Sequence, residues 1–235
     1  MTKDELELAE NCYGYGRWDA PYWFIGLEEG MAPWENGDYA KRADAFRKLN
    51  RDGLCDCRKF HEEIHEQRFF NDAPTLQSTW RYLILLLLAF EGKPTEGETL
   101  DRLQKDYQLK RWGNEDEETG GTCVIELSGL PSNDTEATNK RPLDLRKQLE
   151  EIRPCRIEHI KKMLDLYKPK FAVTYGTTMR KQWLRIAGVQ LERDIPQKTG
   201  EITFLLALHP RARYRNKDRY WIDLGKSLKA ELDRT

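Results

Sequence analysis

A histidine followed by a cluster of arginines stands near the carboxyl end of the chain. The segment Phe204–Arg215 reads FLLALHPRARYR, so an apolar run ends directly at His209. Such a run is typical of a strand covered on both faces, as in the parallel sheet of an α/β protein. Because these sheets carry their chemistry at the carboxyl ends of the strands, we expect His209 to lie in a site suited to a polyanionic ligand. The cations that follow it are Arg211, Arg213 and Arg215.

Two other short runs end in carboxylates. Tyr22–Gly30 (YWFIGLEEG) delivers Glu28 and Glu29 between two glycines, and Cys123–Ser132 (CVIELSGLPS) carries Glu126 near its end. Each run is rich in aromatic or β-branched residues and precedes a plausible helix, which is the βα alternation of a parallel sheet. We therefore expect these carboxylates and the histidine to converge on one pocket.

A fourth run of this kind is Phe171–Thr177 (FAVTYGT). The four runs predict a three-layer α/β/α fold with a central four-stranded, mainly parallel sheet flanked by helices. At this length one domain over residues 1–235 is expected, with a helical insertion around residues 40–110. Apolar residues at three-to-four spacing predict helices over Ala40–Lys48, Arg58–Phe69, Leu76–Phe90, Leu143–Ile152, Arg156–Tyr167, Met179–Ala187 and Tyr220–Leu232.

The overall charge is uninformative, but its distribution is not. Lys plus Arg number 39 against 40 Asp plus Glu, so net charge neither indicates nor excludes nucleic acid. Basic residues gather in Arg141–Lys147 and Arg211–Arg219, and the second segment interleaves Tyr214 and Tyr220 with its arginines. This mixture can grip phosphates and stack on bases. A solvated charged face is the alternative interpretation.

The chain is predicted to be cytoplasmic, in the cytosol or nucleoid of a bacterium, with no membrane partner. Its start, MTKDELELAE, is charged and lacks the apolar core of a signal peptide. The apolar run Leu83–Phe90 is much shorter than the roughly 20 residues of a membrane span, which favours a buried helix. Five cysteines without a tight framework fit a reducing compartment.

A possible metal site lies in Cys55–His65 (CDCRKFHEEIH). It matches H-E-x-x-H, which on a helix would direct His61 and His65 to one zinc ion. A structural site completed by Cys55 and Cys57 is the alternative, although C-x-C is tighter than the usual ligand spacing. Because no third protease ligand is evident, we favour an ordinary amphipathic helix and predict no metal. The side chains that would point inward are Phe60, Ile64 and Phe69.

Taken together, four motifs resemble those of the uracil-DNA glycosylase superfamily. LYKPKFAVTYGTTMRKQW resembles the helix–KPK–strand–Gly–helix signature, and YWFIGLEEG resembles the strand and water-activating loop. CVIELSGLPS resembles the base-recognition strand, and LALHPRAR the HPS-type loop that carries a catalytic histidine. The motifs occur in the family's order and bracket residues of about 22 to 232. The resemblance implies a DNA glycosylase that flips a nucleotide out of DNA.

The resemblance assigns catalytic roles to three residues. Glu28 falls where the family has the Asp or Asn that positions the attacking water, with Glu29 as the fallback. Hydrolysis passes through an oxocarbenium-like sugar, which a nearby carboxylate stabilises while it accepts a proton from water. His209 would donate a hydrogen bond to the departing base. The alternatives are an acidic loop that caps a helix and a histidine satisfied at a strand end.

Base recognition departs from the family at one position. Glu126 falls where uracil readers carry Asn, and an ionised Glu only accepts hydrogen bonds. It would favour a base with an amino donor, such as cytosine, adenine or a modified relative. A protonated Glu could also donate, provided that burial raises its pKa. The other residues implied for the base are Gly26, Trp34 as the stacking platform, and Tyr39, with Phe46 as a further aromatic candidate.

DNA contacts are implied for the segment after the histidine. Arg213 falls where the family's wedge side chain enters the vacated stack, while Arg211 and Arg215 suit phosphates. Tyr214 belongs to the same predicted DNA-binding set. The HPS motif has become His209-Pro210-Arg211, so that a longer cation replaces a serine that touches phosphate.

One branch of the superfamily holds an iron–sulfur cluster on four cysteines. Cys155 matches one ligand position, but Cys12 stands alone where that branch has C-x-x-C, and Ser128 lies near another expected ligand. Four thiolates are required, so no cluster is predicted.

The sequence thus predicts a monomeric, monofunctional DNA glycosylase without cofactor or metal, which releases a modified or non-standard base and leaves an abasic site. The resemblance also covers bacterial phage-defence glycosylases that act on glucosylated hydroxymethylcytosine. Two alternatives are repair of uracil or hypoxanthine and a catalytically inactive DNA-binding module.

Overall fold

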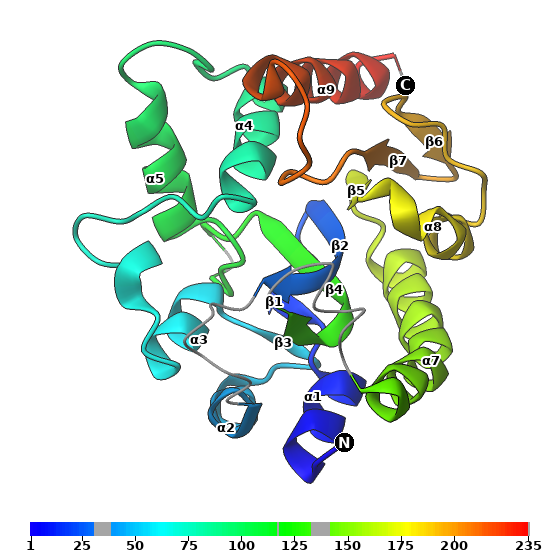
Figure 1. Cartoon of the computed structure of the whole chain (residues 1–235). Helices are drawn as coiled ribbons and strands as arrows, with labels where there is room; N and C mark the ends of the chain where they lie inside the picture. The colour runs from blue at the N-terminus through cyan, green and yellow to red at the C-terminus, as the bar shows by residue number, and fades with distance from the viewer. Residues whose placement is uncertain (31–38, 117, 133–141, 235) are drawn as a thin grey trace.

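A seven-stranded mixed sheet forms the centre of the computed structural model, in the order β3-β1-β4-β2-β5-β7-β6 (Figure 1). The structure describes residues 1–30, 39–116, 118–132 and 142–234. The strands are β1 (Gly14–Gly16), β2 (Tyr22–Gly30), β3 (Leu54–Cys55), β4 (Thr122–Ser132), β5 (Phe171–Tyr175), β6 (Gln197–Thr199) and β7 (Ile202–Ala207).

The predicted α/β architecture is confirmed, but the predicted number of four strands is wrong. The four predicted strands are β4, β2, β5 and β7, which pair in parallel in that order. Three short strands extend this centre: β1 pairs antiparallel with β4, β3 parallel with β1, and β6 antiparallel with β7. With only two or three residues each, these strands are too short to show a period of two in the sequence.

Helices cover both faces of the sheet. They are α1 (Lys3–Asn11), α2 (Tyr39–Leu49), α3 (Cys57–Glu63), α4 (Trp80–Phe90), α5 (Leu100–Lys110), α7 (Leu143–Tyr167), α8 (Arg180–Ala187) and α9 (Lys217–Leu232), with the 3-10 helices η2 (Gln67–Phe69) and η3 (Thr177–Met179). On one face α7 and α8 bury their apolar sides, and on the other α4 packs with α9 over the remaining core (Figure 1).

The helix predictions hold with three corrections. The predicted helix Arg58–Phe69 breaks after Glu63, because His65 adopts a left-handed conformation with φ of 62°. The two helices predicted around Pro154 are one helix, α7, with the proline inside it. The sequence missed α1 and α5 altogether. Residues 40–110 are mostly helical and also contribute strand β3.

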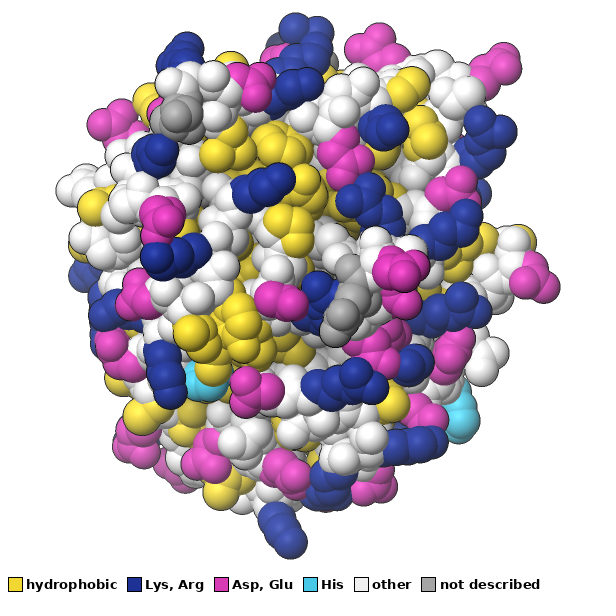
Figure 2. All heavy atoms as spheres, turned by 180° about the vertical axis from the view of Figure 1, so that it is seen from behind, with side chains coloured by type: hydrophobic (Ala, Val, Ile, Leu, Met, Phe, Trp, Pro, Cys, Tyr) yellow, Lys and Arg dark blue, Asp and Glu magenta, His cyan; other side chains and the backbone are white. Residues whose placement is uncertain are grey.

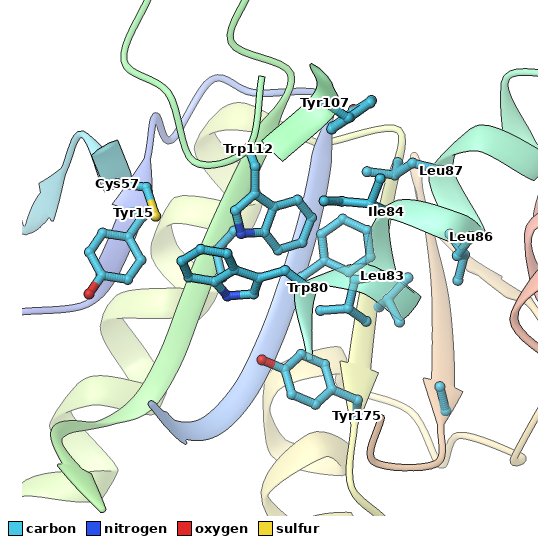
Figure 3. Packing of buried hydrophobic residues seen from close by; sticks show 14 of the residues in the cluster. Tyr15, Cys57, Trp80, Leu83, Ile84, Leu86, Leu87, Tyr107, Trp112 and Tyr175 are labelled. Atoms are coloured by element: carbon cyan, nitrogen blue, oxygen red, sulfur yellow. The ribbon is translucent and has the colours of Figure 1, made fainter. Parts of the chain in front are cut away.

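The apolar run Leu83–Phe90 lies in α4, in the largest core cluster, as the sequence predicted. Its backbone is in close contact with α9, where a Cβ on Gly225 would lie 2.2 Å from the Leu86 carbonyl oxygen. Figure 3 shows Trp80, at the start of α4, beside Trp112 between Tyr15 and Tyr175. Of the helices in the described ranges, none is both long enough and apolar enough to cross a membrane.

Candidate functional site

The candidate site lies at the carboxyl edge of the four parallel strands. Parallel strands end at the same edge, which is where α/β proteins hold their ligands. At this edge β2 ends in Glu28 and Glu29, β5 ends at Tyr175, and His209 follows β7. Glu126 of β4 lies opposite Gly26 of β2. These residues therefore share one edge of the sheet. Glu29 also lines a pocket there, whereas Glu28, Glu126 and His209 are not among the residues that line it.

Glu126, Tyr175 and Gly26 form a tight group. The Tyr175 hydroxyl donates a hydrogen bond to Glu126 Oε1 at 3.4 Å. A Cβ on Gly26 would lie 2.3 Å from the Tyr175 hydroxyl oxygen and 2.6 Å from Glu126 Oε2. Only glycine at position 26 lets the carboxyl and the phenol occupy these places. Gly26, predicted as a base-binding residue, thus gives room to the Glu126 and Tyr175 side chains.

Burial and repulsion favour the protonated form of Glu126. Burial raises the pKa of this carboxyl well above its usual range, and the charges of Glu29 and Glu28 raise it further. The hydrogen bond from Tyr175 and the charge of Arg156 act in the opposite direction but are weaker. Oε2 is enclosed and has no hydrogen-bond partner among the described residues. As a carboxylic acid, Glu126 offers a donor as well as an acceptor.

His209 is held as a neutral imidazole of one tautomer. The backbone N–H of Arg211 donates to His209 Nδ1 at 3.1 Å, so Nδ1 is the acceptor nitrogen. Burial, reinforced by the charges of Arg211 and Lys217, lowers the pKa of His209 to about 4. At neutral pH the ring therefore carries its single proton on Nε2. Its edge packs on the Tyr175 ring, with 5.7 Å between centroids.

Glu29 lies in a buried ionic cluster that sequence reasoning missed. Its Oε2 accepts hydrogen bonds from the Tyr15 hydroxyl at 2.8 Å and from Arg42 at 2.9 Å. Its Oε1 lies 3.6 Å from Nε2 of His61. Burial alone would raise the pKa of Glu29, but Arg42, His61 and the Tyr15 hydrogen bond hold it below its usual value. Glu29 is therefore ionised at neutral pH.

A register shift separates the two adjacent glutamates. Glu28 pairs with Ser128, whereas Gly30 pairs with Ser132, so β4 advances four residues while β2 advances two. Glu28 is partly buried beside β4, and it is Glu29 that reaches the Tyr15–Arg42 cluster. Sequence spacing cannot reveal such a bulge, which re-aims side chains at the end of a strand.

A pocket of about 320 Å³ opens beside Glu29. It includes Arg42 and His61, and it is bounded by Arg211 from the loop after β7. The Arg211 guanidinium lies 3.9 Å from where a Cβ on Gly30 would be, so the loops after β2 and β7 are in contact. The remaining lining residues come mainly from the segment between α3 and α4 and include Arg68, Phe69, Gln77 and Trp80.

A larger pocket of about 530 Å³ lies elsewhere, beside α3 and the segment that leads into the amino end of β4. Its charged side chains pair with one another: Glu115 contacts both Arg51 and Lys59. Because it is at the opposite end of β4 from the carboxylates and the histidine, we place the functional site at the smaller pocket.

The predicted DNA-binding residues occupy the loop between β7 and α9. Arg211, Arg213 and Arg215 are exposed. Tyr214 is half-buried, and its hydroxyl accepts a hydrogen bond from Trp221 Nε1 at 2.7 Å, which anchors the loop to α9. On the face shown in Figure 2, basic and acidic side chains are interspersed.

The predicted aromatic contacts are only partly placed. Tyr39 begins α2, and its hydroxyl lies 3.5 Å from the Pro131 carbonyl oxygen. Trp34, the predicted stacking platform, lies outside the described residues. Phe46 of α2 is buried in the hydrophobic core and does not line the pocket.

The H-E-x-x-H match does not form the two-histidine face of a zinc helix, because α3 ends at Glu63 and His65 is exposed beyond it. The favoured interpretation holds for Phe60 and Ile64, which are buried, while Phe69 is partly buried. Cys155 is exposed on α7. Within residues 1–30, 39–116, 118–132 and 142–234, no group of three or more His, Cys, Asp or Glu side chains is placed to hold a metal ion.

Tyr15, Arg42, His61 and Tyr175 join the site without having been predicted. Tyr175 precedes a glycine at the end of a predicted strand, so its position at the carboxyl edge of the sheet could have been predicted from the sequence. The other three come from segments whose contact with β2 depends on tertiary packing. A comparison with protein-family models finds no match, and neither does a comparison with curated proteins.

Proposed function

We propose that this protein is a monofunctional DNA glycosylase that flips a nucleotide into the pocket and hydrolyses its N-glycosidic bond. The observation that carries the proposal is the fixed tautomer of His209, which presents a neutral Nε2–H donor at the same edge as the ionised Glu29. Arg211 links the two, since its backbone holds His209 and its side chain lines the pocket with Glu29.

The chemistry divides between these two groups. As the bond between the sugar C1′ and the base nitrogen breaks, its electron pair passes to the base. A neutral donor near the base stabilises the developing anion, in the manner of an oxyanion hole. The carboxylate stabilises the oxocarbenium-like sugar and accepts a proton from the water that attacks C1′. The products are a free base and an abasic site.

Base recognition falls to Glu126 in this proposal. In its protonated form the side chain has one donor and one acceptor, like the Asn that the related uracil readers carry. The expectation that an acceptor-only Glu disfavours uracil loses its basis. Uracil and hypoxanthine therefore stand beside hypermodified cytosine, such as the glucosylated hydroxymethylcytosine of phage DNA, as candidate substrates.

DNA engagement is assigned to the loop after β7. Its exposed arginines suit phosphate contacts, which makes binding strongly salt-dependent. Flipping costs a few kcal/mol, and we assign to Arg213 the role of filling the vacated stack. Tyr214 contributes by holding this loop on α9.

The test is base release measured by mass spectrometry. The substrates are uracil DNA, hypoxanthine DNA and phage DNA with hydroxymethylated or glucosylated cytosine. Wild type is compared with Glu28→Gln, Glu29→Gln and His209→Gln, and with His65→Gln as a control at an exposed histidine. We expect one base to be released, with a large loss in Glu29→Gln and His209→Gln and none in the control. DNA binding without release from any substrate would favour the inactive binding module instead.

A further inference from the structure

The ring of His61 is held in a defined tautomer inside the fold. His61 is 3 % exposed, and its Nδ1 lies 2.7 Å from the backbone carbonyl oxygen of Cys57. A carbonyl oxygen only accepts, so Nδ1 must carry a proton. The rings of Phe70 and Trp80 pack around the imidazole and fix its plane. In the neutral ring Nε2 is then a bare acceptor.

That acceptor faces another acceptor. Glu29 Oε1 lies 3.6 Å from His61 Nε2, which is too far for a direct hydrogen bond. The donors that bind Glu29, Tyr15 and Arg42, both occupy Oε2. Two lone-pair atoms that belong to well-packed side chains therefore converge, and both residues line the pocket.

The neutral state of His61 follows from its surroundings. The charged groups that face it are Glu29, Arg42 and Glu66, and the pocket also brings in Arg68 and Arg211. Burial acts against the imidazolium and lowers the pKa of His61, and it outweighs the opposing attraction of Glu29. A second cation at this position would also stand close to Arg42.

The separation of the two acceptors allows one water molecule to hydrogen-bond to both. With two hydrogen bonds of about 2.8 Å to atoms 3.6 Å apart, the acceptor–oxygen–acceptor angle at the water is roughly 80°. This is close enough to the H–O–H angle of water for both O–H···acceptor angles to stay above about 150°. A cation is disfavoured because Arg42 already neutralises Glu29 at 2.9 Å. Water has the two donors that this pair lacks.

We propose that Glu29 Oε1 and His61 Nε2 hold one water molecule between them, and that His61 is a positioning residue for the water that attacks the sugar. The second half of this proposal rests on the proposed glycosylase function, whereas the water site does not. With both hydrogens donated to the protein, the oxygen lone pairs point away from the wall and into the pocket. As the oxygen bonds to C1′, one proton passes to Glu29 and the bond to the base breaks.

The site itself is tested without activity. A high-resolution crystal structure of the wild type should show one water within about 3.2 Å of both atoms. Nitrogen-15 NMR should show His61 as the Nδ1–H tautomer at pH 7.5. The chain has four histidines, so single substitutions assign the signals, with His65→Gln as the exposed control. A dry contact, a cation, the Nε2–H tautomer or an imidazolium at this pH would each overturn the proposal.

The catalytic role is tested by single-turnover base release. His61→Leu removes the acceptor, and we expect roughly a 100-fold slower release with unchanged DNA affinity, the loss that follows from misplacing a reactant. His61→Gln, which can accept through its amide oxygen, should recover part of the rate. The double variant with Glu29→Gln should be no slower than Glu29→Gln alone, because the two side chains act on one water. Full activity of His61→Leu, or additive losses, would refute the positioning role.

The two proposals fail in distinguishable ways. If wild type releases no base but the bridging water and the Nδ1–H tautomer are found, the glycosylase function is lost and the water site stands. If wild type releases a base but His61→Leu is as fast, the function stands and the role of His61 is lost.

Discussion

The free energy of unfolding of the Glu126→Gln variant should increase relative to that of the wild type as the pH rises. The reason is the environment of the Glu126 carboxyl in the fold. The folded-state pKa of Glu126 is raised well above its ordinary value, first by burial and then by Glu29 and Glu28. Between the unfolded and folded values the native state alone binds the proton, so the free energy of unfolding falls with pH. For one group this slope is about 1.4 kcal/mol per pH unit, and it levels off above the folded pKa.

Glutamine cannot ionise, and it keeps the shape of the protonated acid. The difference in unfolding free energy, Glu126→Gln minus wild type, should therefore rise by about 1.4 kcal/mol per pH unit above pH 5 until it reaches a plateau. Urea denaturation at half-unit steps from pH 4.5 to pH 9 measures it directly. Glu10→Gln, at an exposed carboxyl of α1, is the matched control and should give a flat difference.

A flat difference for Glu126→Gln would refute the reasoning, because it would mean that Glu126 ionises in the fold as easily as in the unfolded chain. A falling difference would mean that the carboxylate is stabilised there, and the argument that Glu126 presents a donor to a base would fail with it.

Three further predictions concern the same edge. Gly26→Ala should lower the free energy of unfolding by about 1–3 kcal/mol and displace the Tyr175 ring, since its Cβ would lie 2.3 Å from the phenol oxygen. Gly30→Ala, the control, should cost little, and urea denaturation compares the two variants. Arg42→Met leaves Glu29 buried without its cation and should lower the free energy of unfolding by about 3–5 kcal/mol at pH 8. The loss should be smaller at pH 4, where Glu29 can be protonated, and thermal unfolding at the two pH values measures the difference. Arg213→Ala should weaken flipping, followed by 2-aminopurine fluorescence, more than initial DNA binding, and equal losses would contradict its wedge role.

The sequence identified the parallel centre of the fold because its four strands are long apolar runs. Edge strands of two or three residues leave no such signal. Two separate helices were predicted on either side of Pro154, and a proline inside a helix lacks the N–H of a helical bond. In the fold α7 continues past it, held on the sheet by Ile157, Ile160 and Met163.

The sequence predicted those site residues that lie near or just after the carboxyl end of an apolar run. Glu28, Glu29, Glu126 and His209 could be assigned to one edge by that rule. The sequence could not show which of Glu28 and Glu29 joins the ionic cluster, because this depends on the irregular pairing of β2 with β4. His61 was weighed only as a metal ligand. Its contact with Glu29 depends on the packing of α3 beside β1, which the sequence does not reveal.

The stoichiometry of the products from a single sample distinguishes a monofunctional glycosylase from its alternatives. DNA containing the released base is treated with wild-type protein, the free base is quantified by mass spectrometry, and abasic sites are counted with an aldehyde-reactive probe. We expect equal amounts of free base and abasic site, an intact strand, and no covalent adduct on borohydride treatment. Strand cleavage with a trapped adduct, or no free base from any of the candidate substrates, would contradict this expectation.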